Sequence, residues 1–155
     1  MILRIVLILL TLAGIGSGAF DKSGYYAVFA KGNLQQINQE LDSMKVVNFP
    51  ERDGFEGALL MKKAGLRSSI KDKLSDFKTG GKKLEAAIQA DSSNVEFRFL
   101  RLCIQENAPR FLGYHSDLDR DNLYIRRHFN QLSTVVQDAI KAYSQQSHVL
   151  KLENQ

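Results

Sequence analysis

The sequence predicts an all-α protein of six or seven helices, packed as antiparallel hairpins in a stack or bundle without a sheet. Apolar residues recur with a period near 3.6 in every segment from Leu34 to Tyr143, and no segment shows sustained apolar–polar alternation. Only two prolines, Pro50 and Pro109, interrupt the chain, and the glycines lie mainly between the periodic segments. These observations favour helices joined by short turns.

The first nineteen residues have the pattern of a secretory signal peptide. Arg4 supplies a positive charge, an apolar run extends from Ile5 to Ile15, and small residues lead to an expected cleavage after Ala19. The run is shorter than the roughly 20 apolar residues of a membrane-spanning helix. A buried N-terminal helix or a retained anchor is the alternative. We therefore expect an exported protein, periplasmic or extracellular, that begins at Phe20.

Three helices are expected in the first part of the mature chain. The first covers residues 23–31 and is short. Asn33 is the expected cap of the second, which carries an apolar face as far as Met44. The third starts after Pro50, which suits the first turn of a helix, and stops at Gly65.

The fourth helix has the clearest pattern, although a Gly80-Gly81 pair lies within it. Its apolar face is formed by Ile70, Leu74, Phe77, Gly81, Leu84 and Ile88, and the phase runs unbroken through the pair. We expect one long helix, with Phe77 and Leu84 in the core and a neighbouring helix close to Gly81. Because glycine weakens a helix, two helices with a turn at residues 79–81 are the alternative.

The remaining helices are expected at residues 94–106, with Asn94 as the cap, at residues 117–129, and from Ser133 to Tyr143, with a short turn after Pro109. The first of these is apolar on nearly all sides, which indicates a central position. The tail, residues 147–155, has little to pack and is expected to fray. We therefore expect a single helical domain over residues 20–146.

One junction resembles a tetratricopeptide repeat. From Leu84 to Asn94, an alanine-rich helix end is followed by an Asp-x-x-Asn connector and an aromatic-rich helix. The resemblance covers residues 65–106, lacks a proline at Ser92, and has no second copy at a fixed period. The runs at 56–65 and 97–102 are also similar to uncharacterised exported bacterial all-helical proteins. Together the resemblances imply a degenerate, tetratricopeptide-like (TPR-like) hairpin stack, and no particular chemistry.

Charge and cysteine content narrow the class of protein. The net charge of +4 falls to +3 once Arg4 leaves with the signal peptide, which is too mild to indicate a nucleic-acid partner. The 136 remaining residues suffice for one hydrophobic core. With Cys103 as the only cysteine, the chain has no internal disulfide, and we read Cys103 as a buried apolar residue rather than a nucleophile.

The sequence contains no complete catalytic or metal-binding motif. Asp117 to Asn122 imitates the start of a calcium loop, but Asn122 and His128 stand where the loop needs glycine and a bidentate glutamate. A helix start with acids in its first turn explains the run equally well. The histidines are scattered. We expect no cofactor, no metal and no enzymatic activity.

Two polar features are candidate interaction sites. The first is a basic segment that could meet an anionic surface or form a solvated helix face; it comprises Lys62, Lys63, Arg67, Lys71, Lys73, Lys78, Lys82 and Lys83. The second is the polar stripe of the central helix, Asn94, Arg98, Arg101 and Gln105. Its arginines either line a groove that recognises a carboxylate or pair with neighbouring acids.

These observations predict an exported non-enzymatic interaction or scaffold protein that binds a protein or peptide with an acidic group. One alternative is a small enzyme whose residues converge only in the fold. The other is a peripheral binder of membranes or anionic surfaces, acting through residues 62–83.

Overall fold

The computed structural model describes residues 18–152, which contain seven α-helices, two short 3₁₀ helices and no strand. The all-α prediction is confirmed. The helices are α1 (Lys22–Lys31), α2 (Leu34–Val46), α3 (Arg52–Leu66), α4 (Ile70–Ala90), α5 (Val95–Asn107), η1 (Arg110–Leu112), α6 (Leu118–His128), η2 (Phe129–Gln131) and α7 (Thr134–Ser144). The expected signal peptide lies outside the described residues, apart from Gly18 and Ala19.

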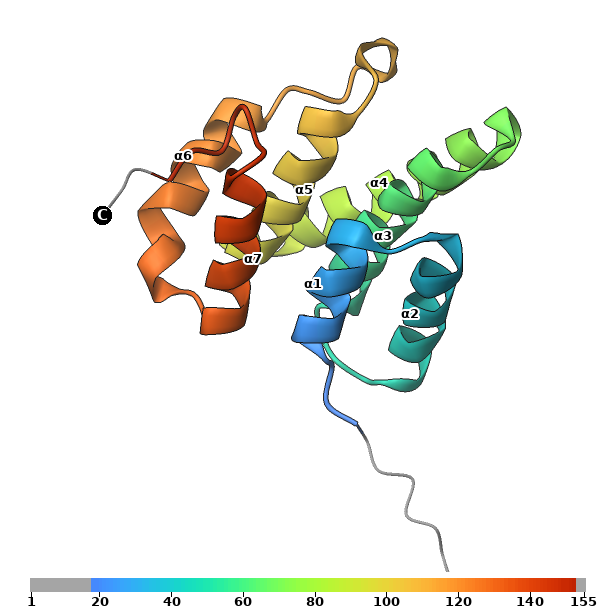
Figure 1. The fold of residues 1–155 in the computed structure, drawn as a ribbon, viewed down its shortest axis with the longest axis horizontal. Helices are drawn as coiled ribbons and strands as arrows, with labels where there is room; N and C mark the ends of the chain where they lie inside the picture. The colour runs from blue at the N-terminus through green and yellow to red at the C-terminus, as the bar shows by residue number, and fades with distance from the viewer. Residues whose placement is uncertain (1–17, 153–155) are drawn as a thin grey trace, which may run out of the picture.

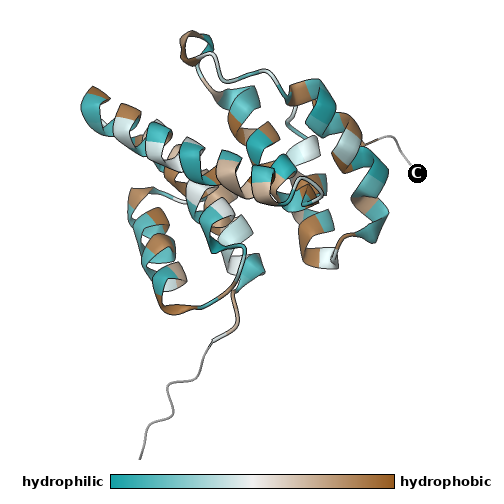
Figure 2. Ribbon diagram, turned by 180° about the vertical axis from the view of Figure 1, so that it is seen from behind, coloured by the Kyte–Doolittle hydropathy of each residue, from teal (hydrophilic) through white to brown (hydrophobic). Residues whose placement is uncertain are grey.

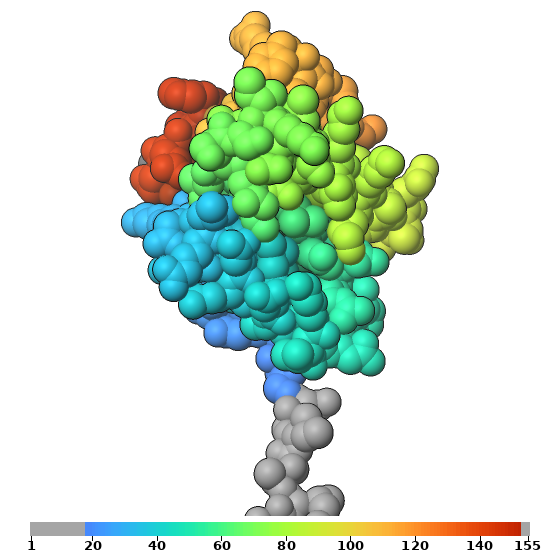
Figure 3. Space-filling model, turned by 90° about the vertical axis from the view of Figure 1, so that its right-hand side faces the viewer, coloured from blue at the N-terminus to red at the C-terminus, as the bar shows by residue number. Residues whose placement is uncertain are grey.

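Helices α3 and α4 form an antiparallel hairpin that extends to one side of the molecule (Figure 1). Helix α5 lies in the middle and contacts α3, α4 and α6. Helices α1 and α2 pack on one side, and α1 also contacts α7, which brings the two ends of the helical region together. From the side, the hairpin (green) lies between α1 and α2 (blue) and the segment that follows α5 (orange) (Figure 3).

Side-chain caps fix several helix starts where the sequence predicts them. Asn33 Oδ1 accepts a hydrogen bond from the Gln36 amide at 2.9 Å, and Gln36 Oε1 accepts one from the Asn33 amide at 3.0 Å. This reciprocal pair satisfies two amides that have no partner within the helix. Asn94 caps α5 with a single bond, its side chain accepting from the Phe97 amide at 3.0 Å.

Helix α4 is continuous through both glycines, so the single-helix prediction is confirmed. The close approach, however, is at Gly80 and not at Gly81 as expected. A Cβ atom at Gly80 would lie 2.5 Å from the carbonyl oxygen of Gly57 on α3, whereas one at Gly81 would only touch the end of Met61 at 3.5 Å. The two helices therefore touch backbone to backbone where Gly57 faces Gly80.

The hydrophobic core follows the central helix. Leu100 and Leu102 of α5 are fully buried, as the apolar character of this helix predicts. Leu84 of α4 is fully buried too, whereas Phe77 is half-buried, with its ring edge-on to Tyr114. Ile70 and Leu74, in the N-terminal third of α4, are exposed, so this part of the hairpin extends beyond the helices that cover Leu84.

Residues 147–152, the described part of the tail, pack against the helices, which corrects for these residues the expectation that the tail frays. Ser147 and Leu150 are buried. Glu106 at the end of α5 holds this segment: its carboxylate accepts hydrogen bonds from Ser147 Oγ at 2.6 Å, Tyr143 Oη at 2.7 Å, and the backbone amides of residues 148 and 149 at 2.5 and 3.1 Å. The sequence signal for this clamp was weak, because a single glutamate meets partners 37–43 positions away.

We expect Glu106→Gln to lower the free energy of unfolding at pH 7 by about 1.5–3 kcal/mol, the usual worth of hydrogen bonds to a charged group. Burial opposes ionisation of Glu106, but the hydrogen bonds outweigh it and hold the pKa of this carboxyl below its ordinary value of 4.5. Its stabilisation is therefore present above the unfolded-state pKa and is lost as pH falls through the lower folded-state pKa. Urea unfolding between pH 3 and pH 7 measures both effects.

Glu51→Gln is the matched control, because Glu51 is exposed and its side chain makes no cap hydrogen bond. It should change stability by no more than about 0.5 kcal/mol. If the Glu106 variant behaves like this control and keeps the wild-type acid dependence, the carboxylate does not hold the tail.

Candidate functional site

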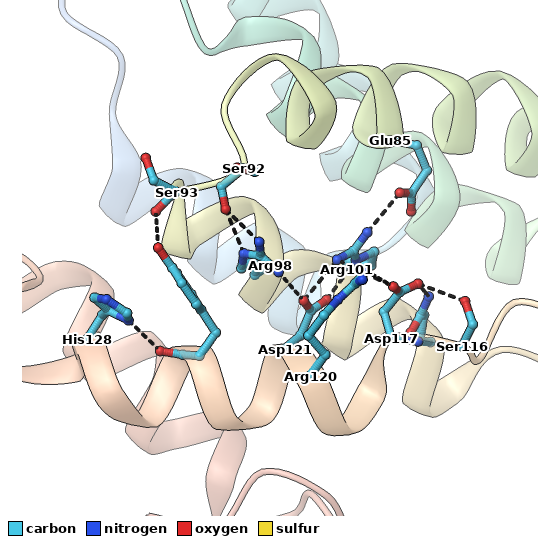
Figure 4. A network of polar contacts seen from close by, with 12 residues as sticks. Glu85, Ser92, Ser93, Arg98, Arg101, Ser116, Asp117, Arg120, Asp121 and His128 are labelled. Atoms are coloured by element: carbon cyan, nitrogen blue, oxygen red, sulfur yellow. Dashed lines mark hydrogen bonds and ion pairs between the residues drawn. The ribbon is translucent and has the colours of Figure 1, made fainter.

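The two arginines of the polar stripe on α5, Arg98 and Arg101, point toward α6 (Figure 4). Asp121 of α6 is fully buried, and its two oxygens accept hydrogen bonds from Arg101 Nε at 2.7 Å and Arg101 Nη2 at 2.8 Å. This is the bidentate arrangement that a planar guanidinium forms with a carboxylate. Arg101 is itself only 3 % exposed, so the pair is part of the interior.

Arg98, which lies one helical turn before Arg101 on α5, belongs to the same cluster. Its Nη1 donates to Asp121 at 2.9 Å, and its Nε and Nη2 donate to the carbonyl oxygen of Ser92 at 2.9 and 2.6 Å. The guanidinium also lies over the ring of Tyr124, 4.4 Å from the ring centroid. Arg98 thus ties the α4–α5 connection to α6.

The network continues through Gln105 and reaches α4. Gln105 is fully buried; it donates to Asp117 Oδ2 at 3.0 Å and accepts from the Asp117 amide at 3.1 Å. Burial opposes ionisation of Asp117, but hydrogen bonds from Gln105 and Ser116 and the nearby arginines hold its pKa below the ordinary value. Arg101 Nη1 also donates to Glu85 of α4 at 2.8 Å.

These contacts correct the expectation that Asn94, Arg98, Arg101 and Gln105 line an open groove. Asn94 caps its own helix, and the other three are engaged by internal acceptors. Pairing with neighbouring acids, the alternative that the sequence left open, is what the structure has. The missed signal was the i, i+4 spacing of Asp117 and Asp121, which places both carboxylates on the face of α6 opposite the arginines.

The same network accounts for the calcium-like run, since the carboxylates of its first and fifth residues, Asp117 and Asp121, are bonded to α5. Among residues 18–152, no group of three histidine, cysteine, aspartate or glutamate side chains is placed to hold a metal ion. Burial raises the pKa of the Cys103 thiol well above its ordinary value, so the thiol stays protonated at neutral pH.

The basic segment lies on the α3–α4 hairpin, and part of its charge is neutralised there. Arg67 Nε lies 2.7 Å from Asp76, and Lys83 Nζ lies 3.0 Å from Asp53 and 3.1 Å from Glu56. Lys71, Lys78 and Lys82 are exposed, and no ion pair joins them to another described residue. None of the described helices is long and apolar enough to cross a membrane.

A large concave surface, which the sequence did not predict, lies between α1, the hairpin, the C-terminal end of α5, η1 and α7. We call it the apolar groove and define its rim by Leu66, Ile70, Leu74, Phe111 and Val135. Its volume is about 1570 Å³. The hydropathy colouring shows apolar segments at the free end of the hairpin and on the η1 loop, two of the walls (Figure 2).

The rim residues are unusual because they are apolar, large and exposed. Seven large apolar side chains of the described chain are exposed, and five of them are these rim residues; Ile70 is 76 % and Phe111 84 % exposed. The floor is formed by buried aromatic and thiol groups, including Phe99 and Cys103. A contiguous exposed apolar surface of this kind marks an interaction site, whereas single exposed apolar residues do not.

No protein-family model matches the chain, and neither a curated protein nor a solved structure matches it.

Proposed function

We propose that this protein is an exported, non-enzymatic binding protein whose apolar groove receives a segment of a partner protein. The observation that carries the proposal is that five of the seven exposed large apolar side chains of residues 18–152 lie on one concave surface. A partner that covers these five side chains would remove apolar surface from water, which favours association.

The chemistry of the lining supports binding over catalysis. The titratable groups on the described lining are three lysines, one aspartate, two tyrosines and the protonated Cys103. A nucleophile needs a base within hydrogen-bond distance, whereas the side chain that is hydrogen-bonded to the Cys103 thiol is the hydroxyl of Tyr143. Most of the lining is aliphatic or aromatic, as in grooves that bind peptides.

Peripheral binding to an anionic surface is the second candidate, favoured by exposed Lys71, Lys78 and Lys82 on the hairpin. Leu66 and Ile70 lie at the free end of the hairpin, but Phe111 and Val135 belong to the other walls of the groove, and binding through the hairpin alone would leave them uncovered. Co-sedimentation with anionic vesicles at rising salt separates the two functions, because attraction through exposed lysines is screened within about 10 Å at 0.1 M salt.

Site-specific photo-crosslinking in the producing cell tests the groove directly. We expect a photo-reactive amino acid at Ile70 or Phe111 to crosslink one discrete partner. The matched controls are Val46 and Leu123, which are large, apolar and exposed but lie outside the groove. Equal crosslinking from all four positions, or none from the groove positions, would show that the groove is not a protein-binding surface.

A further inference from the structure

We infer that the apolar groove takes an amphipathic α-helix whose apolar stripe faces the floor and whose flanking acidic residues face Lys31, Lys62 and Lys73. The inference rests on the proposed function and specifies its ligand. Three features of the groove carry it: the nature of its walls, its size and the distribution of its charges.

The walls favour a helix over an extended peptide. Every described element around the groove is a helix or a turn, so the main-chain N–H groups of the walls are largely bonded within their own helices, and no strand edge is offered. An extended peptide would leave its own N–H and C=O groups unpaired against apolar side chains, which is costly. A helix satisfies these groups internally and presents only side chains, as in other helix-in-groove complexes.

The size agrees with a short helix. The volume of about 1570 Å³ exceeds the range of about 300–1,000 Å³ typical of small-molecule pockets. A helix with side chains is about 10–12 Å wide and rises 1.5 Å per residue, so this volume corresponds to about 9–13 residues. That is two and a half to three and a half turns, enough for apolar residues at i, i+3 or i+4, and i+7.

The charged residues of the groove predict which flank of the bound helix carries its acidic residues. Lys31 ends α1, Lys62 lies near the end of α3 and Lys73 is on α4, so all three cations come from the α1 and hairpin walls. No carboxylate of residues 18–152 lies within 4 Å of their ammonium groups; Lys62 instead lies over the ring of Phe29. Asp138 on α7 is the acid of the opposite wall. Complementary charge sets the orientation and choice of partner more than its affinity.

A displayed library of 13-residue helical peptides tests the ligand class with the purified full chain. Four positions of one helix face are fixed as leucine, and the flanking positions are randomised. We expect selection to enrich aspartate and glutamate on one flank of the leucine stripe. With Lys31→Glu/Lys73→Glu, the same selection should enrich lysine and arginine there, and the peptides selected on the wild type should bind about tenfold more weakly.

Lys71→Glu/Lys78→Glu is the matched control, because both lysines are exposed on α4 but lie outside the groove. It changes the net charge equally and should leave the selected peptides and their affinity unchanged. Equal effects of the two double variants would overturn the inference, because net charge would then be responsible rather than the groove.

Other outcomes assign the groove to a different occupant. Saturable binding of a fluorescent fatty acid that displaces the peptides would assign it to acyl chains, and a concentration-dependent dimer lost in Ile70→Asp would assign it to a second copy. Peptide binding only by a chain that starts at Phe20 would assign it to the apolar run of residues 5–15. Failure of these selections while crosslinks from Ile70 and Phe111 persist overturns the helix and its charges but leaves the proposed function intact.

Discussion

Asp121→Ala should lower the free energy of unfolding by about 3–5 kcal/mol, the usual cost of removing one partner from a buried ion pair. The cost arises because two arginines lose a hydrogen-bond acceptor. Arg101 is 3 % exposed and loses both bonds of its bidentate contact, and Arg98 loses one. After the substitution, Arg101 keeps its hydrogen bond to Glu85. A guanidinium is too strong a base to escape this cost by losing its proton.

Urea unfolding followed by circular dichroism measures the effect. Arg120→Ala is the control on the same helix, because Arg120 is exposed and pairs only with Asp117 at the surface of the network. It should cost less than about 1 kcal/mol, as exposed ion pairs do. Similar costs for the two variants would show that the interior of the network does not hold α5 and α6 together.

The network also shows which part of the site the sequence could predict. The spacing of Arg98 and Arg101 on an otherwise apolar helix correctly indicated that their charges needed a special environment. Two environments were compatible with that pattern, a groove or buried acids. The choice between them depends on which helix packs against α5, and helical periodicity carries no information about pairing.

The apolar groove was missed for a related reason. Ile70 and Leu74 continue the apolar stripe of α4, so periodicity assigns them to the core with Leu84. A period near 3.6 shows that a helix has an apolar face. That face is buried only where a neighbouring helix is long enough to cover it. In the structure α4 extends beyond its neighbours, which leaves Ile70 76 % exposed while Leu84 is fully buried. Phe111, in a short 3₁₀ turn, belongs to no stripe at all.

The helices themselves were predictable because local interactions define them. Asn33 and Asn94 cap the helices that the sequence assigned to them, and α4 continues through its two glycines as its unbroken phase indicated. The error of one residue at the glycine pair has a geometric cause. Successive residues are 100° apart on a helix, so Gly80 and Gly81 both border the apolar stripe, and the sequence does not show which of them faces α3.

This difference gives the second prediction with a large expected effect: Gly80→Ala should destabilise the protein by about 2–3 kcal/mol, whereas Gly81→Ala should stabilise it by about 0.5–1 kcal/mol. At Gly80 the new methyl group would lie 2.5 Å from the carbonyl oxygen of Gly57 and 2.9 Å from the backbone nitrogen of Met61. Backbone atoms cannot rotate away as a side chain can. The hairpin must therefore separate, which loosens its packing along both helices.

At Gly81 the methyl group would meet only the Met61 side chain, with Cε at 3.5 Å and Sδ at 3.9 Å. That is ordinary van der Waals contact, and the thioether is flexible. Alanine at this position then raises the free energy of unfolding, because it restricts the unfolded chain and favours the helix by about 1 kcal/mol relative to glycine.

The two variants differ by one position and carry the same added atom, so composition and charge are matched. Thermal and urea unfolding should place them on opposite sides of the wild type. Greater damage at Gly81 than at Gly80 would mean that α4 is rotated by one residue against α3, and the groove wall formed by Ile70 and Leu74 would rotate with it.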